Sequence, residues 1–183
     1  MKQIGIINKE DTALLVIDVQ EKLMPVIHKG EQLIREVNLL IKGAEILQLP
    51  VIVTEQYPKG LGHTIGELQI PSNVATIQKV CFSCMLSEPL NMKLKALDIH
   101  SLILCGVESH ICVLKTALDA LKQGFDVHVV ADAVSSRTES NKKLALERMR
   151  QAGAFIVSTE MILFQLLDEA GTEEFKSISK LIR

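Results

Sequence analysis

The stretch SLILCGVESHICVLKTALDALKQG, residues 101–124, contains two different hydrophobic patterns in succession. Its first five residues form a short apolar run that ends at Gly106, which is typical of a buried strand. After Ser109, apolar side chains recur at helical spacing until Gly124, a natural end for a helix. These side chains are Ile111, Leu114, Ala117, Leu118 and Leu121. The stretch therefore predicts a strand followed directly by a helix that starts near Ser109.

The same alternation of strand-like and helix-like patterns runs along the rest of the chain. Further apolar runs predict strands at residues 13–17, 51–53, 74–77, 125–131 and 154–157. Helical spacing predicts helices at residues 31–49, 87–97, 109–123, 139–152 and 159–168. Strands that are apolar on both faces and alternate with helices indicate a parallel sheet covered by helices. We therefore predict one domain, residues 1–183, with a three-layer α/β/α architecture and a mostly parallel, six-stranded, Rossmann-like sheet.

The bulk composition narrows the class of protein. Hydrophobic residues make up 48% of the 183 residues, which is enough for a real core in one domain. Aromatic residues make up 3% and the net charge is −2, so we expect no nucleic-acid partner. The N-terminus has no signal-peptide core and no apolar stretch approaches the length of a membrane span, so we expect no membrane partner. Four cysteines without a secretory signal predict free thiols and a cytoplasmic location.

Cys112 lies where an α/β protein would place a nucleophile. Ser109 is a good N-cap residue, so Cys112 occupies the third position of the predicted helix. There, the unsatisfied amides and the positive end of the helix dipole favour a thiolate. The alternative is that Cys112 only fills space, because free cysteine is among the most buried residue types.

Two charged residues follow other predicted strands. Asp18 closes the apolar run at residues 13–17, and Lys79 comes after the weaker run at residues 74–77. Because the carboxyl ends of parallel strands meet at one edge of a sheet, we expect both side chains near the loop that enters Cys112. There a carboxylate can act as a base towards the thiol, and a lysine can stabilise an anion. Taken alone, Asp18 also fits a strand-end cap, and Lys79 a surface lysine with its stem along apolar surface.

Cys81 and Cys84 form a Cys-x-x-Cys pair, which can be a redox couple or half of a zinc site. No second ligand pair follows and no charged activator is evident, so we interpret the spacing as coincidental. The histidines are dispersed, and only His63, in a glycine-flanked loop, and His110, beside Cys112, are placed to line a pocket. No pair has metal-ligand spacing and no phosphate-binding glycine loop is present, so we expect no metal and no cofactor.

Three segments together resemble the isochorismatase-like cysteine hydrolases. They are residues 14–20 (LLVIDVQ), Lys79, and residues 106–113 (GVESHICV), in the order acid, lysine, cysteine. Residues 54–62 (TEQYPKGLG) and 127–137 (VHVVADAVSSR) are similar to the isochorismatase domain-containing subgroup of that family. The resemblance covers nearly the whole chain.

The resemblance implies a catalytic triad of Asp18, Lys79 and Cys112. In the family the peptide bond that matches Val107–Glu108 is typically cis, which here would turn backbone amides towards the reacting carbonyl. Together with the Cys112 amide, they would form an oxyanion hole. By analogy, Asp18 takes the thiol proton and returns it to the leaving amine, Lys79 orients Asp18, and a thioester forms and hydrolyses.

Two departures from the family pattern narrow the implied chemistry. Nicotinamidases of the family carry metal ligands as Asp-x-His after the second strand, where this chain has residues 55–58 (EQYP). Isochorismatases have no cysteine at the position of the nucleophile. We therefore expect a metal-free enzyme that hydrolyses a C–N bond, in an amide or carbamoyl group of a small molecule. Fold and triad do not identify that substrate.

Two alternatives from other functional classes stay open. The chain can be a binding or scaffold protein that has kept the pocket and lost turnover, or a thiol–disulfide redox protein that uses Cys81 and Cys84. Relatives in the family commonly assemble, so we expect a homo-oligomer, a dimer or a tetramer. The substrate-binding residues that we predict are Gln20, Tyr57, His63, Phe82, Cys84 and His110.

Overall fold

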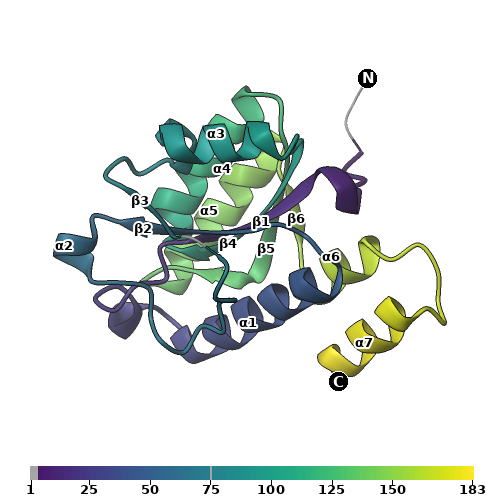
Figure 1. Ribbon diagram of the computed structural model, residues 1–183. Helices are drawn as coiled ribbons and strands as arrows, with labels where there is room; N and C mark the ends of the chain where they lie inside the picture. The colour runs from purple at the N-terminus through teal and green to yellow at the C-terminus, as the bar shows by residue number, and fades with distance from the viewer. Residues whose placement is uncertain (1–3, 75) are drawn as a thin grey trace.

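The computed structural model describes residues 4–74 and 76–183, and it confirms the predicted three-layer α/β/α architecture (Figure 1). Six strands form one sheet in the order β3-β2-β1-β4-β5-β6, and every neighbouring pair is parallel. The strands are β1 (Thr12–Ile17), β2 (Val51–Gln56), β3 (Thr76–Lys79), β4 (Ser101–Val107), β5 (Asp126–Ser135) and β6 (Phe155–Val157).

Helices cover both faces of the sheet. The α-helices are α1 (Gly30–Ile46), α2 (Pro58–Leu61), α3 (Glu88–Ala96), α4 (Leu114–Lys122), α5 (Glu139–Ala152), α6 (Thr159–Gln165) and α7 (Glu173–Ile182). Short helical turns are η1 (Lys9–Asp11), η2 (Met24–Val26), η3 (Cys84–Leu86) and η4 (Ser109–Val113). None of the helices in the described part of the chain is long and apolar enough to span a bilayer.

The core consists of two apolar layers, one on each face of the sheet. Side chains alternate along β1, so Leu14 and Val16 pack towards α1, whereas Leu15 and Ile17 pack towards α3 and α4. α6 and α7 lie on the α1 side, and α5 lies on the α4 side (Figure 1). Because both faces are covered, β1, β2 and β4 are buried along their whole length, which explains their continuous apolar runs.

Several predicted boundaries differ from the structure. α1 ends at Ile46 rather than residue 49, because Gln48 adopts a left-handed conformation (φ 58°) that a helix cannot continue through. The strand predicted at residues 74–77 is found at Thr76–Lys79, and Ala75 lies outside the described residues. β2 and β5 extend further towards the carboxyl edge than predicted.

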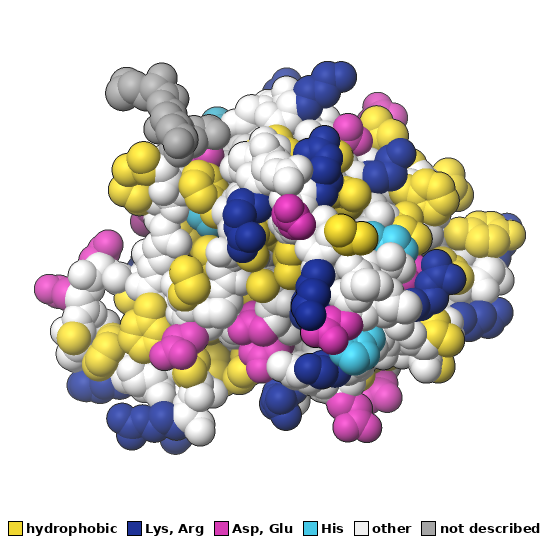
Figure 2. All heavy atoms as spheres, turned by 180° about the vertical axis from the view of Figure 1, so that it is seen from behind, with side chains coloured by type: hydrophobic (Ala, Val, Ile, Leu, Met, Phe, Trp, Pro, Cys, Tyr) yellow, Lys and Arg dark blue, Asp and Glu magenta, His cyan; other side chains and the backbone are white. Residues whose placement is uncertain are grey.

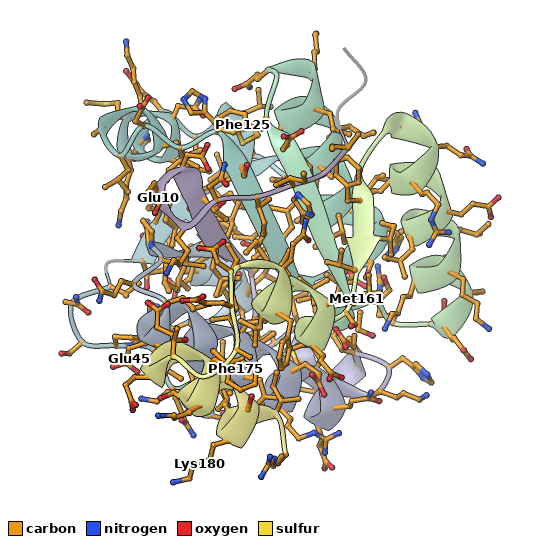
Figure 3. All side chains as sticks on the ribbon, turned by 90° about the vertical axis from the view of Figure 1, so that its right-hand side faces the viewer. Glu10, Glu45, Phe125, Met161, Phe175 and Lys180 are labelled. Carbon is orange, nitrogen blue, oxygen red and sulfur yellow. The ribbon has the colours of Figure 1, made fainter. Side chains whose placement is uncertain are left out.

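A C-terminal helix was not predicted at all. The last predicted helix, at residues 159–168, ends at Gln165, and α7 follows it. The hydroxyl of Thr172 caps α7 by accepting a hydrogen bond from the backbone N–H of Phe175 at 3.1 Å. Phe175, labelled in Figure 3, lies in α7. Its ring packs edge-on against that of Phe164 in α6, with centroids 6.2 Å apart, and so joins α7 to α6.

The strand order reverses at β1, and this reversal decides where a site can form. From β1 the chain adds β2 and β3 on one side and β4, β5 and β6 on the other, so the carboxyl ends of β1 and β4 flank the point where sheets of this type bind ligands. Gly106 lets β4 approach β1 closely at this point. Its φ is +106°, and a Cβ here would overlap the carbonyl oxygen of Ile17.

Candidate active site

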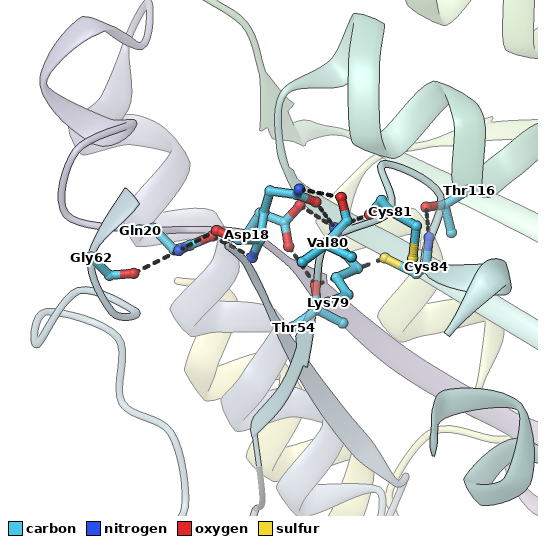
Figure 4. A network of polar contacts seen from close by, with 10 residues as sticks. Asp18, Gln20, Thr54, Gly62, Lys79, Val80, Cys81, Cys84 and Thr116 are labelled. Carbon is cyan, nitrogen blue, oxygen red and sulfur yellow. Dashed lines mark hydrogen bonds and ion pairs between the residues drawn. The ribbon is translucent and has the colours of Figure 1, made fainter. Parts of the chain in front are cut away.

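Asp18 and Lys79 form a buried ion pair at the carboxyl edge of the sheet (Figure 4). Lys79 Nζ lies 2.7 Å from Asp18 Oδ2, and neither side chain is more than 1% exposed. Asp18 directly follows β1 with a left-handed backbone (φ 53°), a conformation that is costly for most non-glycine residues and clusters at active sites. The structure therefore brings two of the predicted catalytic residues into direct contact.

Three oxygen atoms surround the amine of Lys79. Besides Asp18 Oδ2, Lys79 Nζ donates to Gln56 Oε1 at 2.9 Å and to the carbonyl oxygen of Cys81 at 3.3 Å. Burial opposes the charge of Lys79, but its neighbours, Cys84 first and then Asp18, outweigh that effect and raise the pKa of Lys79. Lys79 is therefore a cation at neutral pH, and it acts on Asp18 as a fixed positive charge.

Two polar residues of β2 hold this pair, and neither was among the predicted site residues. Thr54 Oγ1 donates to Asp18 Oδ1 at 2.7 Å, while Gln56 Oε1 accepts from Lys79. Gln56 Nε2 donates to the carbonyl oxygen of Val80 at 2.8 Å, which fixes the direction of the amide. The signal in the sequence was their spacing: positions i and i+2 of one strand share a face of the sheet.

Cys112 lies in η4, a π-helical turn directly before α4, and is 6% exposed. The predicted N-cap at Ser109 is wrong: Glu108 precedes the turn, and the buried Ser109 hydroxyl has no partner among the described residues. The pKa of Cys112 is raised by burial first and then by the charge of Asp18, and both effects oppose the predicted stabilisation of a thiolate by the helix N-terminus. Asp18 thus lies beside a protonated thiol, which is the arrangement that a general base requires.

Glu108, the residue between β4 and η4, is fixed by hydrogen bonds of both its side chain and its backbone. The peptide bond between Val107 and Glu108 is cis. The buried carboxylate of Glu108 accepts hydrogen bonds from Nε and from the backbone N–H of Arg137, at 3.1 and 3.3 Å. The carbonyl oxygen of Glu108 accepts from the backbone N–H groups of Ile111 at 3.0 Å and Val113 at 3.3 Å. Both the side chain and the backbone of Glu108 therefore fix the turn that carries the thiol.

Two of the predicted substrate-binding residues, Gln20 and Cys84, are buried. The amide of Gln20 is bonded to backbone groups: Nε2 donates to the carbonyl oxygens of Gln56 and Gly62, and Oε1 accepts from the N–H of Gln56. Cys84 Sγ lies 3.8 Å from Thr54 Oγ1, next to the ion pair. Gln20 thus joins the end of β2 to the following loop, and Cys84 belongs to the polar cluster around Asp18 (Figure 4).

The other predicted substrate-binding residues are more exposed. Tyr57 and Phe82 are about half exposed, at 52% and 53%. His110 belongs to the same turn as Cys112, and its Nδ1 lies 2.9 Å from Ser136 Oγ. A cavity of about 470 Å³, lined among others by Tyr57, Lys79 and Leu86, opens beside β3. A larger cavity of about 560 Å³ lies by η2 and α1, and none of the predicted site residues lines it.

His63, another predicted substrate-binding residue, pairs with Glu55. Its Nδ1 lies 3.2 Å from Glu55 Oε2, and Glu55 Oε1 accepts from the backbone N–H of Thr64 at 2.7 Å. Burial disfavours the carboxylate of Glu55, but Thr64 and then His63 offset it and lower the pKa of Glu55. Within residues 4–74 and 76–183, no cluster of three or more His, Cys, Asp or Glu side chains is arranged to hold a metal.

Comparison with known proteins shows which family of sequences this chain matches. Residues 12–161 match the family model of the isochorismatase domain. Isochorismatase domain-containing protein 2 of Xenopus laevis is 40% identical over 183 residues, which cover all of this chain and 88% of that protein.

Two solved structures have the same fold over nearly the whole chain. The first, described as the MAR1 ribonuclease from Caenorhabditis elegans, is 42% identical with a TM-score of 0.90, and the match covers 96% of this chain and 91% of that one. The second, the YcaC gene product of Escherichia coli, is described as an octameric hydrolase of unknown specificity. It is 27% identical with a TM-score of 0.92, and the match covers 100% of this chain and 91% of that one.

Proposed function

The chain belongs to the isochorismatase family, and from this we propose that it is a cysteine hydrolase that cleaves a C–N bond, in an amide or carbamoyl group of a small molecule. The observation that carries the proposal is the buried ion pair of Asp18 and Lys79, 2.7 Å apart, beside the thiol of Cys112. Two buried charges cost more desolvation than apolar side chains of similar size. Their presence at a strand-order reversal, next to a nucleophile, therefore favours a chemical role.

The proposed reaction has two steps in which Asp18 moves one proton. Asp18 takes the proton of Cys112 as the sulfur attacks the carbonyl carbon, and the backbone amides of Glu108 and Cys112 stabilise the oxyanion. Asp18 gives the proton to the leaving nitrogen as the C–N bond breaks, which leaves a thioester. Asp18 then takes a proton from water, the hydroxyl attacks the thioester, and the acid departs as Cys112 regains its proton. Lys79 stays charged throughout.

The redox alternative has less support. All four cysteines, including Cys81 and Cys84, are free thiols. Burial, as the largest influence, raises the pKa of Cys84 to about 11, whereas a redox-active cysteine needs a lowered value. Cys84 is also fixed through its backbone N–H, which donates to Thr116 Oγ1 at 2.9 Å. These contacts favour a structural role for Cys84.

RNA is the second substrate class that the comparisons raise, through the description of the C. elegans structure. The net charge of −2 argues against it, because backbone phosphates are bound mainly by clustered cations. On the face drawn in Figure 2, basic and acidic side chains are interspersed rather than gathered into a basic patch. We therefore rank the small-molecule substrate first and include RNA in the test.

We also propose that the protein forms a homo-oligomer. Val80, Phe82 and Leu86 are exposed apolar side chains close together in the chain, and Val80 and Leu86 line the cavity that reaches Lys79. Apolar side chains that gather at a surface favour an interface between protein chains. The octameric state of the E. coli structure supports this proposal.

The proposed hydrolysis is tested by incubating the protein with a mixture of small amides and carbamoyl compounds and measuring intact mass. We expect an acyl or carbamoyl adduct on Cys112, loss of turnover in Cys112→Ala, and normal turnover in Cys81→Ala. RNA cleavage that persists in Cys112→Ala would overturn the proposal. Ligand retention without turnover or adduct would instead identify a silent binding member of the family.

A further inference from the structure

Thr54 reaches Asp18 only because the backbone turns at that residue. Thr54 shares a face of β2 with Ile52, which belongs to the apolar layer around Cys112. A regular continuation of β1 would place residue 18 on the other face, with Val16. The left-handed φ of 53° breaks the alternation, and the carboxylate of Asp18 accepts the Thr54 hydroxyl at 2.7 Å instead. The left-handed turn at Asp18 and the hydroxyl of Thr54 together set the direction of the carboxylate.

The direction of the hydrogen bonds around Thr54 follows from the number of protons. A hydroxyl has one proton to donate, and an ionised carboxylate only accepts, so Thr54 donates to Asp18. The contact of 3.8 Å between Thr54 Oγ1 and Cys84 Sγ then requires Cys84 to be the donor. Burial keeps Cys84 protonated, since its pKa is raised to about 11. The hydrogen bonds Cys84→Thr54→Asp18 therefore both point towards the carboxylate of Asp18 and fix the direction of the Thr54 hydroxyl.

We propose that Thr54 is a positioning residue, which holds the carboxylate of Asp18 in the orientation from which it can take the proton of Cys112. Lys79 fixes Asp18 Oδ2 and Thr54 fixes Asp18 Oδ1, so the carboxylate is held at both oxygens. Each carboxylate oxygen has a second lone pair, which leaves an acceptor site free for the thiol. The inference rests on the proposed role of Asp18 as base, and it assigns to Thr54 no contact with the substrate.

The test follows the alkylation of Cys112 by iodoacetamide against pH, read by mass spectrometry, because this needs no knowledge of the substrate. In Thr54→Val the carboxylate loses one hydrogen-bond donor. We therefore expect the acidic limb of the alkylation rate profile to move up by about one pH unit, which corresponds to a tenfold change in proton binding by the carboxylate. The rate on the plateau should also fall, because the carboxylate can rotate. Thr54→Ser keeps the donor and should restore the wild-type profile.

The matched control is Thr12→Val, at the other end of β1. Thr12 is fully buried, and its hydroxyl has no partner among the described residues, so this variant makes the same chemical change away from the site. Its profile should equal that of the wild type. If thermal melting shows that Thr54→Val is not folded, Thr54→Ala takes its place. This variant removes the same donor and puts no methyl group in the position of the hydroxyl.

Two outcomes would overturn the role of Thr54. The first is a rate that changes by the same factor at every pH in Thr54→Val, as a merely structural effect would produce. The second is a Thr54→Ser profile that resembles Thr54→Val. Both differ from failure of the proposed hydrolase, which would appear as absent turnover with an unchanged dependence of Cys112 alkylation on Thr54.

Discussion

The carbonyl oxygen of Ile17 occupies the space that a side chain at Gly106 would need. Ile17 is the last residue of β1, and the next residue is Asp18, whose carboxylate binds Lys79. This tight contact between β1 and β4 is thus one residue away from the proposed base. A change at Gly106 therefore disturbs the packing of the sheet and the site together.

Gly106→Ala should prevent folding or destabilise the protein by more than about 3 kcal/mol. A Cβ there meets backbone atoms of Ile17, which cannot move aside without breaking the sheet. Gly124→Ala is the matched control: its φ is +90°, but nothing lies within 4 Å of the added carbon. It should cost only the left-handed strain, about 1–2 kcal/mol. Equal losses in urea unfolding of the two variants would show that the overlap is not what matters.

Lys79→Met should cost about 3–5 kcal/mol of unfolding free energy, because it leaves the carboxylate of Asp18 buried without its cation. Adding Asp18→Leu to Lys79→Met removes the second charge and should recover much of that loss. Denaturant unfolding of the wild type, both single variants and the double variant measures the coupling. If the two single losses simply add in the double variant, Asp18 and Lys79 do not interact in the folded protein, which would contradict the proposed role of the pair.

Local patterns predicted most of the elements, because caps and apolar spacing lie within the residues of each element. α5 was predicted at residues 139–152, where Thr138 caps it by accepting from the N–H of Asn141 at 3.2 Å. Its end at Gly153 is marked by a left-handed φ of 108°. α7 was missed although its signals are also local: Thr172 caps it, and Phe175, Ile178 and Ile182 recur at helical spacing.

The candidate site was likewise predicted only in part. The contact between Asp18 and Lys79 follows from parallel strands whose carboxyl ends share one edge of the sheet, so residue positions were enough to predict it. The roles of Thr54 and Gln56 depend on a left-handed turn at Asp18, and the protonated state of Cys112 depends on burial. Sequence spacing contains neither the backbone turn nor the depth of burial.

Asp18→Asn should lower the pKa of Cys112 while abolishing turnover. Burial raises that pKa most, and the charge of Asp18 raises it further, whereas Lys79 lowers it. Removing the carboxylate charge leaves burial and Lys79, so the thiolate should form at lower pH than in the wild type. Ultraviolet absorbance of the thiolate, with Cys112→Ala as baseline, measures this shift. An unchanged or higher midpoint would mean that Asp18 does not interact with the thiol.

His128 should make the protein lose stability as the pH falls from about 6.5 to about 4. It is buried in β5, stacks on Phe155, and burial lowers its pKa to about 4, whereas the unfolded value is about 6.5. In that window the unfolded chain binds a proton that the native state does not bind, so the free energy of unfolding falls by roughly 3 kcal/mol. Denaturant unfolding of His128→Leu at both ends of the window should show a smaller loss than in the wild type. His100→Leu, at an exposed position, should keep the wild-type loss, and an equal loss in all three proteins would exclude His128 as the cause.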